Sequence, residues 1–277
     1  MQSVWNEKCI ISPSLICLDM CNLESQIRIL EQSGIKMLHV DILDGHFSPS
    51  MPLGLDTVRQ LRAKTKLQFD CHVMVTEQDY FVDELLDIGV EQIVFHAETQ
   101  PHIDGMLNRI HAKGAKAGVA LKPATPLSAV EYVLEKCDTV LLMLINPGYA
   151  FVKGEKQVAY ADRKIRELRR MIDERGLDTK IEVDGRISPQ NIVDYGKRDV
   201  DIFVTGSTCL DRNDLAGSFE KLQKAVGKAP GEQWDEDEKL TFSSLYSRFE
   251  LEYEAKGGEK LSITTGDAFL ALISLYD

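Results

Sequence analysis

The chain has 277 residues, of which 44% are hydrophobic and 27% charged, and its formal net charge is −12. An acidic chain without a basic stripe argues against a nucleic-acid partner, and no apolar run approaches the roughly 20 residues that cross a bilayer, so we expect no membrane partner either. The six cysteines form no Cys-x-x-Cys pair, and the first eight residues contain no apolar secretory segment. Reduced thiols and a cytoplasmic location are therefore expected.

Eight hydrophobic runs alternate with eight amphipathic stretches between Cys9 and about Val226. The predicted strands are rich in Val, Ile and Leu and span Ile10–Cys17, Met37–Leu43, Leu67–Val75, Gln92–Ala97, Lys116–Leu121, Thr139–Ile145, Lys180–Asp184 and Asp201–Thr205. The predicted helices span Leu23–Gln32, Leu55–Arg62, Gln78–Ile88, Ile103–Ala112, Pro126–Lys136, Val158–Arg175, Pro189–Tyr195 and Asn213–Val226. Eight βα units predict an α/β fold, a (β/α)8 TIM barrel. A doubly wound open sheet is the alternative, but it would need fewer strands and a different closing element.

The pattern changes after Val226. Residues 227–231 have the composition of a linker, and an acidic stretch follows at 232–238. Apolar residues then recur at helical spacing, namely Phe242, Leu245, Tyr246, Phe249 and Tyr253, and a second short apolar helix is predicted over Thr265–Tyr276. We therefore expect a barrel domain at 1–226 and an acidic linker with a mostly helical C-terminal extension at 227–277. A loosely ordered acidic tail is the alternative.

Four ionisable side chains lie near the carboxyl ends of predicted strands. His39 and Asp41 belong to the second strand, His72 to the third and Asp184 to the seventh. The active site of a TIM barrel lies at these strand ends, and residues two apart in a strand share a face. Two imidazoles and two carboxylates suit one divalent metal ion such as Zn²⁺, Fe²⁺ or Mn²⁺. A His-x-Asp pair that only satisfies its own hydrogen bonds is the alternative for each piece alone.

A metal site with two carboxylates could move a proton at a carbon next to a carbonyl. A metal that binds the carbonyl and the neighbouring hydroxyl makes removal of the proton between them easier, because it stabilises the enediolate. The aspartate on one face would remove the proton and the aspartate on the other face would return one, which inverts the carbon.

Glycines end three neighbouring strands near this site. Gly148 follows the sixth strand, Gly185 the seventh, and Gly206-Ser207 the eighth. Glycine lets backbone N–H groups approach an anion, and many barrels bind phosphate after strands 7 and 8. The three together favour a phosphate site, although each glycine alone could simply permit a tight turn.

Five motifs, in this order and spacing, resemble the ribulose-phosphate 3-epimerase family from about Cys9 to about Leu222. They are Ile11-Ser-Pro-Ser-Leu15, His39-Val-Asp-Ile-Leu-Asp-Gly-His-Phe47, Asp70-Cys-His-Val-Met-Val75, Asn146-Pro-Gly148 and Glu182-Val-Asp-Gly185. Within the family, Ile11–Asp19 and Asp70–Tyr80 are most similar to the allulose 6-phosphate 3-epimerase branch. The resemblance implies a metal held by His39, Asp41, His72 and Asp184, with the two aspartates as the acid/base pair at C3 of a phosphorylated ketose.

The resemblance also implies the residues that surround the substrate. Met74 and Met143 match two methionines beside the reacting carbon, while Leu43 stands where the family usually has a third. The expected substrate-binding residues are Ser14, His72, Met74, Met143, Gly148, Gly185, Arg186, Gly206 and Ser207. The resemblance suggests a homo-oligomer as well.

Two departures from the family pattern fall at the phosphate end. Phe151 replaces a glycine of the loop after the sixth strand, and Arg186 follows Asp184-Gly185 where the family commonly has Gly or Ser. Arg binds phosphate in a bidentate manner, so we hypothesise that Arg186 compensates for the altered loop and changes which sugar phosphate fits. A solvent-facing Arg that only precedes the next helix is the alternative.

The sequence therefore predicts a metal-dependent ketose-phosphate 3-epimerase, an isomerase of carbohydrate metabolism acting on D-ribulose 5-phosphate, D-allulose 6-phosphate or a close relative. One alternative is a decarboxylase or synthase of the phosphate-binding barrel group. Those enzymes resemble this chain in fold but use a strand with the pattern Asp-x-Lys-x-x-Asp, and Asp70-Cys71-His72 has no such Lys. The other alternative is a non-catalytic phosphosugar-binding or regulatory barrel.

Overall fold

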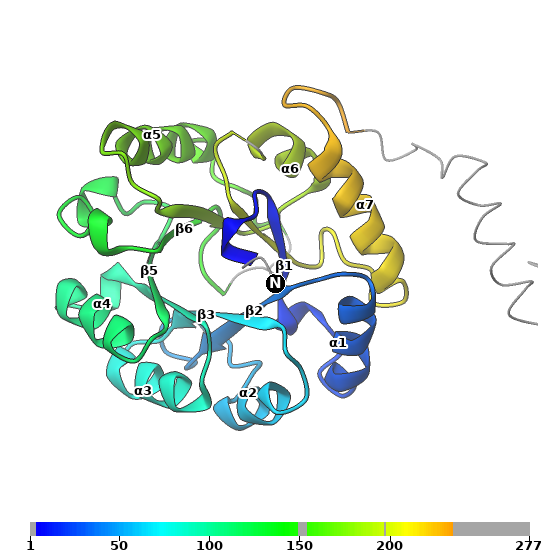
Figure 1. Ribbon diagram of the computed structural model, residues 1–277, viewed down its shortest axis with the longest axis horizontal. Helices are drawn as coiled ribbons and strands as arrows, with labels where there is room; N and C mark the ends of the chain where they lie inside the picture. The colour runs from blue at the N-terminus through cyan, green and yellow to red at the C-terminus, as the bar shows by residue number, and fades with distance from the viewer. Residues whose placement is uncertain (1–3, 149–153, 197, 235–277) are drawn as a thin grey trace, which may run out of the picture. The chain divides into compact units, whose positions relative to one another are not determined.

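Eight parallel strands form one closed sheet in the computed structural model, which describes residues 4–148, 154–196 and 198–234. The strands are β1 (Ile10–Pro13), β2 (Met37–Leu43), β3 (Gln68–Met74), β4 (Gln92–His96), β5 (Lys116–Leu121), β6 (Thr139–Met143), β7 (Lys180–Asp184) and β8 (Ile202–Thr205). The strand order is β1-β8-β7-β6-β5-β4-β3-β2, and a parallel bridge between Ser14 and His39 joins the two end strands. The predicted TIM barrel is confirmed (Figure 1).

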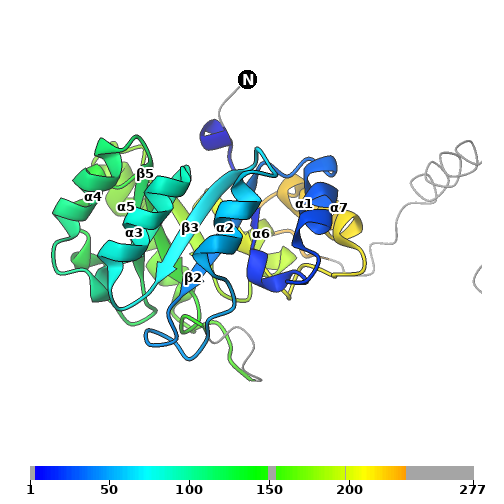
Figure 2. The ribbon, with the colours of Figure 1, turned by 90° about the horizontal axis from the view of Figure 1, so that it is seen from below.

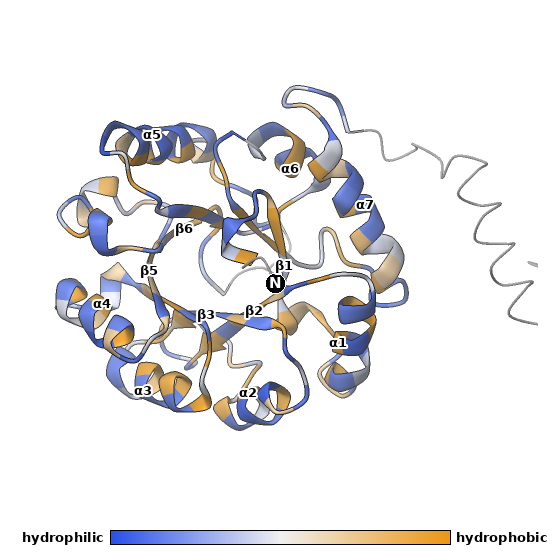
Figure 3. Ribbon diagram, viewed as in Figure 1, coloured by the Kyte–Doolittle hydropathy of each residue, from blue (hydrophilic) through white to orange (hydrophobic). Residues whose placement is uncertain are grey.

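Seven α-helices surround the barrel within the described part of the chain. They are α1 (Leu23–Gln32), α2 (Leu55–Arg62), α3 (Gln78–Ile88), α4 (Ile103–Ala112), α5 (Ala161–Glu174), α6 (Pro189–Tyr195) and α7 (Leu215–Gly227). Each helix turns an apolar stripe toward the strands and a polar face outward, as the colours of Figure 3 show. In α5 the buried stripe is Ile165, Leu168 and Ile172, at spacings of three and four residues. This packing places the main apolar core between the helices and the outer face of the sheet.

Two predicted elements are wrong in part. The expected strand Ile10–Cys17 ends at Pro13, because Ser14 begins a 3₁₀ turn in which Cys17 N–H donates to Ser14 O at 3.1 Å. The expected helix Pro126–Lys136 is two 3₁₀ turns, Leu127–Ala129 and Leu134–Lys136. Its two valines are β-branched and poor helix formers, and the backbone there makes i→i+3 hydrogen bonds instead.

The strand register stacks polar side chains in two layers inside the barrel. His39 pairs with Asp70, and Asp41 pairs with His72, between β2 and β3. Because side chains two apart share a face, each strand contributes one residue to a lower layer and one to an upper layer nearer the carboxyl ends. β2 and β3 run toward the same end of the barrel (Figure 2). The upper layer therefore faces the loops that follow the strands.

The barrel lies within the first of two units, Met1–Trp234 and Asp235–Asp277. The predicted C-terminal helices, Phe151 and residues 235–277 lie outside the described residues. Trp234 packs against the core, and its N–H donates to Gln190 Oε1 of α6 at 2.5 Å. No helix among the described residues has the length and apolar character needed to cross a membrane.

Candidate metal and active site

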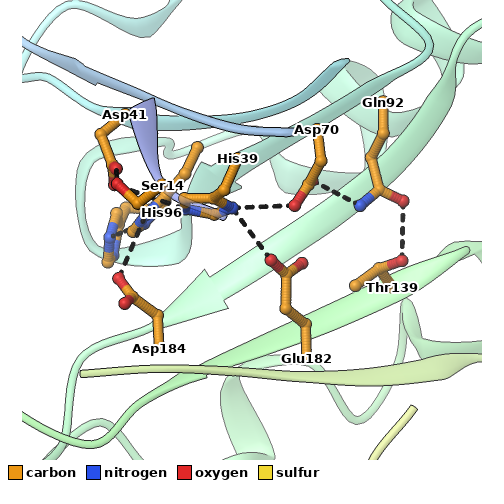
Figure 4. A network of polar contacts seen from close by, with 10 residues as sticks. Ser14, His39, Asp41, Asp70, Gln92, His96, Thr139, Glu182 and Asp184 are labelled. Atoms are coloured by element: carbon orange, nitrogen blue, oxygen red, sulfur yellow. Dashed lines mark hydrogen bonds and ion pairs between the residues drawn. The ribbon is translucent and has the colours of Figure 1, made fainter. Parts of the chain in front are cut away.

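The four predicted metal ligands converge at the carboxyl end of the barrel. One ligand atom from each of His39, Asp41, His72 and Asp184 lies within 4.8 Å of the others. His39 Nε2 is 3.3 Å from Asp41 Oδ1, and His72 Nδ1 is 3.5 Å from the same oxygen. Asp184 Oδ2 lies 3.9 Å from His72 Nδ1, across the barrel on β7. Figure 4 shows Asp41 and Asp184 on opposite sides of this group.

The two aspartates have different electrostatic surroundings in the metal-free protein. Burial by itself raises the pKa of Asp41, but the neighbouring His39 and the close approach of both imidazoles lower it below its usual range. Ser14 Oγ also donates to Asp41 Oδ2 at 2.6 Å. Burial, followed by repulsion from Asp41, raises the pKa of Asp184 to about 6. Of the two aspartates, Asp184 is therefore the one that binds a proton more readily.

The carboxylates of Asp70 and Glu182 hold His39 at Nδ1. His39 Nδ1 lies 2.8 Å from Asp70 Oδ2 and 3.2 Å from Glu182 Oε1. Asp70 Oδ1 in turn accepts from Gln92 Nε2 at 2.7 Å, so Asp70 has an acceptor role on both oxygens. Burial, followed by the charge of Asp70, raises the pKa of Glu182 well above its usual range. Asp70 and Glu182 therefore contact His39 at the nitrogen turned away from Asp41, and with His39 they form a second group of side chains whose ligand atoms lie within 4.8 Å of one another.

His72 is held by a residue of the neighbouring strand β4. Its Nε2 lies 2.9 Å from His96 Nε2 on β4. His96 Nδ1 lies 2.8 Å from Glu98 Oε2, which belongs to the 3₁₀ turn after β4. The His96 ring also packs on Phe47 of the loop after β2, with 4.6 Å between ring centroids. His96 is therefore a hydrogen-bonded barrel residue, as its fully buried side chain requires.

The group fits a divalent metal ion by a direct structural criterion. His39 Nε2 and His72 Nδ1 are buried and have no hydrogen-bond partner, and both face the two aspartates. A buried nitrogen without a hydrogen-bond partner destabilises the folded state unless another group, such as a metal ion, binds it. Two nitrogens and two carboxylates form a donor set that Zn²⁺, Fe²⁺ and Mn²⁺ all accept.

A pocket opens above the metal group. The predicted residues that line it are Ser14, Asp41, Met74, Met143, Gly148, Asp184, Gly185, Arg186, Gly206 and Ser207. His39 and His72 are not in this lining, because both lie fully buried beneath it. Leu43 lines the pocket beside Met74 and Met143, so it occupies the position of the missing third methionine.

The glycines of the pocket are required by space as well as by backbone conformation. A Cβ on Gly185 would lie 2.8 Å from Ile145, and Gly185 has φ +118°. A Cβ on Gly148 would overlap Ser48, and one on Gly206 would lie 2.9 Å from Cys17 Sγ. Close packing thus accounts for these glycines without an anion, while their place in the pocket wall leaves room for one.

Arg186 adopts a backbone conformation that is rare for a residue with a side chain. Its φ is 51°, in the left-handed region. The turn is held by Gln157 Nε2, which donates to Gly185 O at 2.9 Å and to Arg186 O at 3.1 Å. Because Arg186 is only partly exposed and lines the pocket, it does not simply point into solvent before α6.

Sequence reasoning gave no role to several residues that shape this site. Asp70 and Glu182 were visible in the sequence, since each stands two positions before a predicted ligand and so shares its face. Glu98 carries no such signal, because it lies beyond the end of β4. Cys17 lines the pocket only because its segment is a turn and not a strand.

Comparison with known proteins agrees with this fold and shows the family of the chain. The model of the ribulose-phosphate 3 epimerase family matches residues 10–210. The chain is 36% identical over 216 residues to ribulose-5-phosphate-3-epimerase of Arabidopsis thaliana, covering 77% of this chain and 76% of the relative. It is 34% identical over 224 residues to ribulose-phosphate 3-epimerase of Escherichia coli K12, covering 80% and 98%. A solved KGPDC of Streptococcus mutans shares the fold with a TM-score of 0.62 and 9% identity, covering 80% and 98%.

The fold and the relatives define a TIM-barrel enzyme of the isomerase class, and its barrel holds a metal-compatible group that includes two carboxylates. The match over most of the barrel shows more than this class. The chain belongs to the ribulose-phosphate 3-epimerase family.

Proposed function

We propose that this protein is a metal-dependent ketose-phosphate 3-epimerase that inverts C3 by proton transfer between Asp41 and Asp184. The observation that carries the proposal is that these two carboxylates form one group with the buried imidazoles of His39 and His72. A substrate between the aspartates would present one face of C3 to each. That arrangement is what inversion by removal and return of a proton requires.

The unequal surroundings of the two aspartates support this division of labour. Asp41, whose pKa is lowered, is ionised, while Asp184, whose pKa is raised to about 6, holds a proton more readily, so the two carboxyls can stand in different protonation states. In the reverse direction the two roles exchange. Ser14 fixes one oxygen of Asp41 and leaves the other facing the imidazoles. Met74, Met143 and Leu43 exclude water beside the reacting carbon.

His39, Asp41, His72 and Asp184 would hold the metal ion. When bound, a divalent cation would offset the negative charge that develops on the ketose oxygens as the C3 proton leaves. Asp70 and Glu182 orient His39 so that its unpartnered Nε2 faces this position. Which of zinc, iron or manganese is used depends on supply as well as on these ligands.

The phosphate is proposed to lie against the loops after β6, β7 and β8. Gly148, Gly185, Gly206 and Ser207 line that end of the pocket, and Arg186 supplies the positive charge there. A left-handed Arg costs about 1–2 kcal/mol of strain, and such strain gathers at functional sites. This supports a role for Arg186 in selecting the sugar phosphate.

The named relatives support D-ribulose 5-phosphate as the substrate type. They give no support to D-allulose 6-phosphate, which stays a prediction for a substrate panel. The barrel decarboxylase and synthase alternative rests on shared fold alone, since KGPDC is only 9% identical. A cytoplasmic location, a homo-oligomer and a domain boundary near residue 226 are further proposals. Free cysteines throughout the chain support the first of these.

Exchange of the C3 proton tests the proposed function directly. The protein would be incubated in D₂O with phosphorylated pentuloses and hexuloses and with Zn²⁺, Mn²⁺ or Fe²⁺. Proton NMR would follow the loss of the C3 proton signal as deuterium replaces it, together with the ratio of the two epimers. We expect exchange with interconversion, reduced about 10²–10⁴-fold in Asp41→Asn and Asp184→Asn. Tyr132→Ala, a change at a side chain that is 97% exposed, is the control and should not alter the rate. Binding of a phosphosugar without any exchange would identify a regulatory barrel instead.

A further inference from the structure

A chain of three hydrogen-bonding side chains runs from a metal-site imidazole toward the surface of the barrel. It consists of His72, His96 and Glu98, on β3, on β4 and in the turn after β4. The contacts are 2.9 Å between the two Nε2 atoms and 2.8 Å between His96 Nδ1 and Glu98 Oε2. Neither His96 nor Glu98 lies in the pocket wall or within the metal group.

Glu98 can only accept in this chain. Its Oε1 accepts from Lys122 N–H at 2.7 Å and from the Thr125 hydroxyl. Burial alone would raise the pKa of Glu98, but hydrogen bonds from His96, Thr125 and Lys122 N–H lower it to about 2, so near neutral pH it is an ionised carboxylate with no proton to give. The proton between Glu98 and His96 must therefore be on His96 Nδ1.

The positions of the remaining protons follow from that one. A neutral His96 with its proton on Nδ1 carries a lone pair on Nε2. A contact of 2.9 Å between two ring nitrogens needs one proton between them, so His72 Nε2 supplies it. A neutral His72 with its proton on Nε2 has its lone pair on Nδ1, the buried atom that faces Asp41 and has no partner.

We propose that His96 and Glu98 are positioning residues that fix His72 as the tautomer whose Nδ1 lone pair faces the metal site. The inference rests on the proposed metal-dependent function and adds the means by which one ligand is set. His39 is fixed through Nδ1 by the carboxylates of Asp70 and Glu182 and presents Nε2, whereas His72 is fixed through a second imidazole and presents Nδ1. The two ligands are therefore held by independent supports.

The His96 ring has little freedom to turn away from this role. Phe47 stacks on one side of it, and the Lys122 ammonium lies 3.9 Å from the centre of the Phe47 ring. The backbone of Lys122 is held as well, because Lys164 Nζ donates to Lys122 O at 2.9 Å and to Pro123 O at 3.0 Å. Elements after β2 and β5 and helix α5 thus brace the support of a ligand on β3.

The affinity for Zn²⁺ alone, without substrate, tests the proposal. It would be measured by competition with a coloured chelator, and the visible spectrum of the Co²⁺-loaded protein would report the ligand geometry. His96→Leu leaves His72 Nε2–H without an acceptor, and we expect affinity to fall about 10–100-fold with a changed Co²⁺ spectrum. In His96→Gln the amide oxygen can accept from His72, so most of the affinity should return.

Two further variants make the outcome decisive. Glu98→Gln is a milder change at a half-buried side chain and should weaken Zn²⁺ binding several-fold if His96→Leu fails to fold. His111→Leu removes a histidine from another His–carboxylate pair, the surface contact with Asp138 at 2.8 Å, and should bind Zn²⁺ as the wild type does. Wild-type affinity in both His96→Leu and Glu98→Gln would overturn this inference alone. A wild-type protein that binds no divalent metal would overturn the proposed function and this inference with it.

Discussion

Arg186 combines a strained backbone conformation with a side chain that lines the pocket. Its left-handed φ of 51° destabilises the folded state, while its side chain lines the pocket where a phosphate is proposed. Gln157 holds the turn through the carbonyls of Gly185 and Arg186. Such strain is tolerable if the guanidinium adds more to the binding free energy of the phosphate than the strained backbone takes from the free energy of unfolding.

Replacement of Arg186 by Gly and by Ala separates the two effects. Both variants lose the guanidinium, so both should raise KM for the phosphorylated ketose. Only Arg186→Gly relieves the backbone, and its free energy of unfolding should exceed that of Arg186→Ala by about 1 kcal/mol. Steady-state kinetics and denaturant unfolding would measure the two quantities. An unchanged kcat/KM in Arg186→Ala would remove Arg186 from the substrate site.

Glu98 gives the clearest pH dependence at this scale. Burial alone would raise its pKa, but hydrogen bonds from His96, Thr125 and Lys122 N–H outweigh burial and lower it from 4.5 to about 2. A lowered carboxyl pKa stabilises the folded state above pH 4.5, and that stabilisation is lost as pH falls toward 2. After allowance for solvent at this half-buried group, we expect about 1–2 kcal/mol. Unfolding of wild type and Glu98→Gln between pH 7 and 3 should show their difference shrinking. A constant difference would contradict the assignment.

At the scale of elements, α6 ties the loop after β7 to the barrel. Ser188 forms a capping box with Asn191, and Pro189 occupies the first helical position. Asn191 Oδ1 also lies 3.1 Å from Gln157 Nε2, which holds the turn at Arg186. The cap of this helix and the turn that lines the pocket therefore share a hydrogen-bond network.

Loss of the N-cap of α6 should lower the free energy of unfolding more than it lowers the catalytic rate. Ser188→Ala removes the side chain that accepts from Asn191 N–H, and we expect a loss of about 1 kcal/mol in the free energy of unfolding. Ser128→Ala, at an exposed serine, is the matched control. Urea unfolding followed by circular dichroism would measure both. Equal midpoints in the two variants would show that the capping box does not stabilise α6.

The elements also show what a sequence can and cannot predict here. The order of strands and the ligand positions followed from alternation, because His39 and Asp41 share a face of a buried strand. The ends of elements were less certain: Ser14 leaves the strand for a turn, and the segment 126–136 forms two short turns although Val130 and Leu134 are buried at helical spacing. The contact of His72 with His96 depends on register between strands, which no single strand encodes.

For the whole molecule, the apolar core and the polar interior of the barrel have different functions. The apolar core lies between the sheet and the helices and stabilises the fold without any ligand. The buried polar layers are costly unless their partners are complete. Two of their nitrogens have none in the protein itself, so stability should depend on what occupies the metal position.

Metal binding should therefore raise the thermal stability of the whole barrel. A metal at 100 times its dissociation constant adds about 2.7 kcal/mol to the free energy of unfolding. Addition of Zn²⁺ or Mn²⁺ to chelator-treated protein should raise Tm, and the rise should be much smaller in His39→Gln, which lacks the imidazole. Differential scanning calorimetry, with Mg²⁺ as a control cation of different ligand preference, would measure this. A Tm that is indifferent to metals would argue against the site.

Ser14 and His39 form the bridge between the first and second strands, and the Ser14 hydroxyl contacts the aspartate two residues beyond His39. The seam at which the ring of strands meets itself is thus also one wall of the reaction centre. A chain that has formed its helices but has not yet joined this seam would have no working centre. Recovery of turnover during refolding would consequently require that this joint has closed, and we expect it to lag behind the return of helical structure.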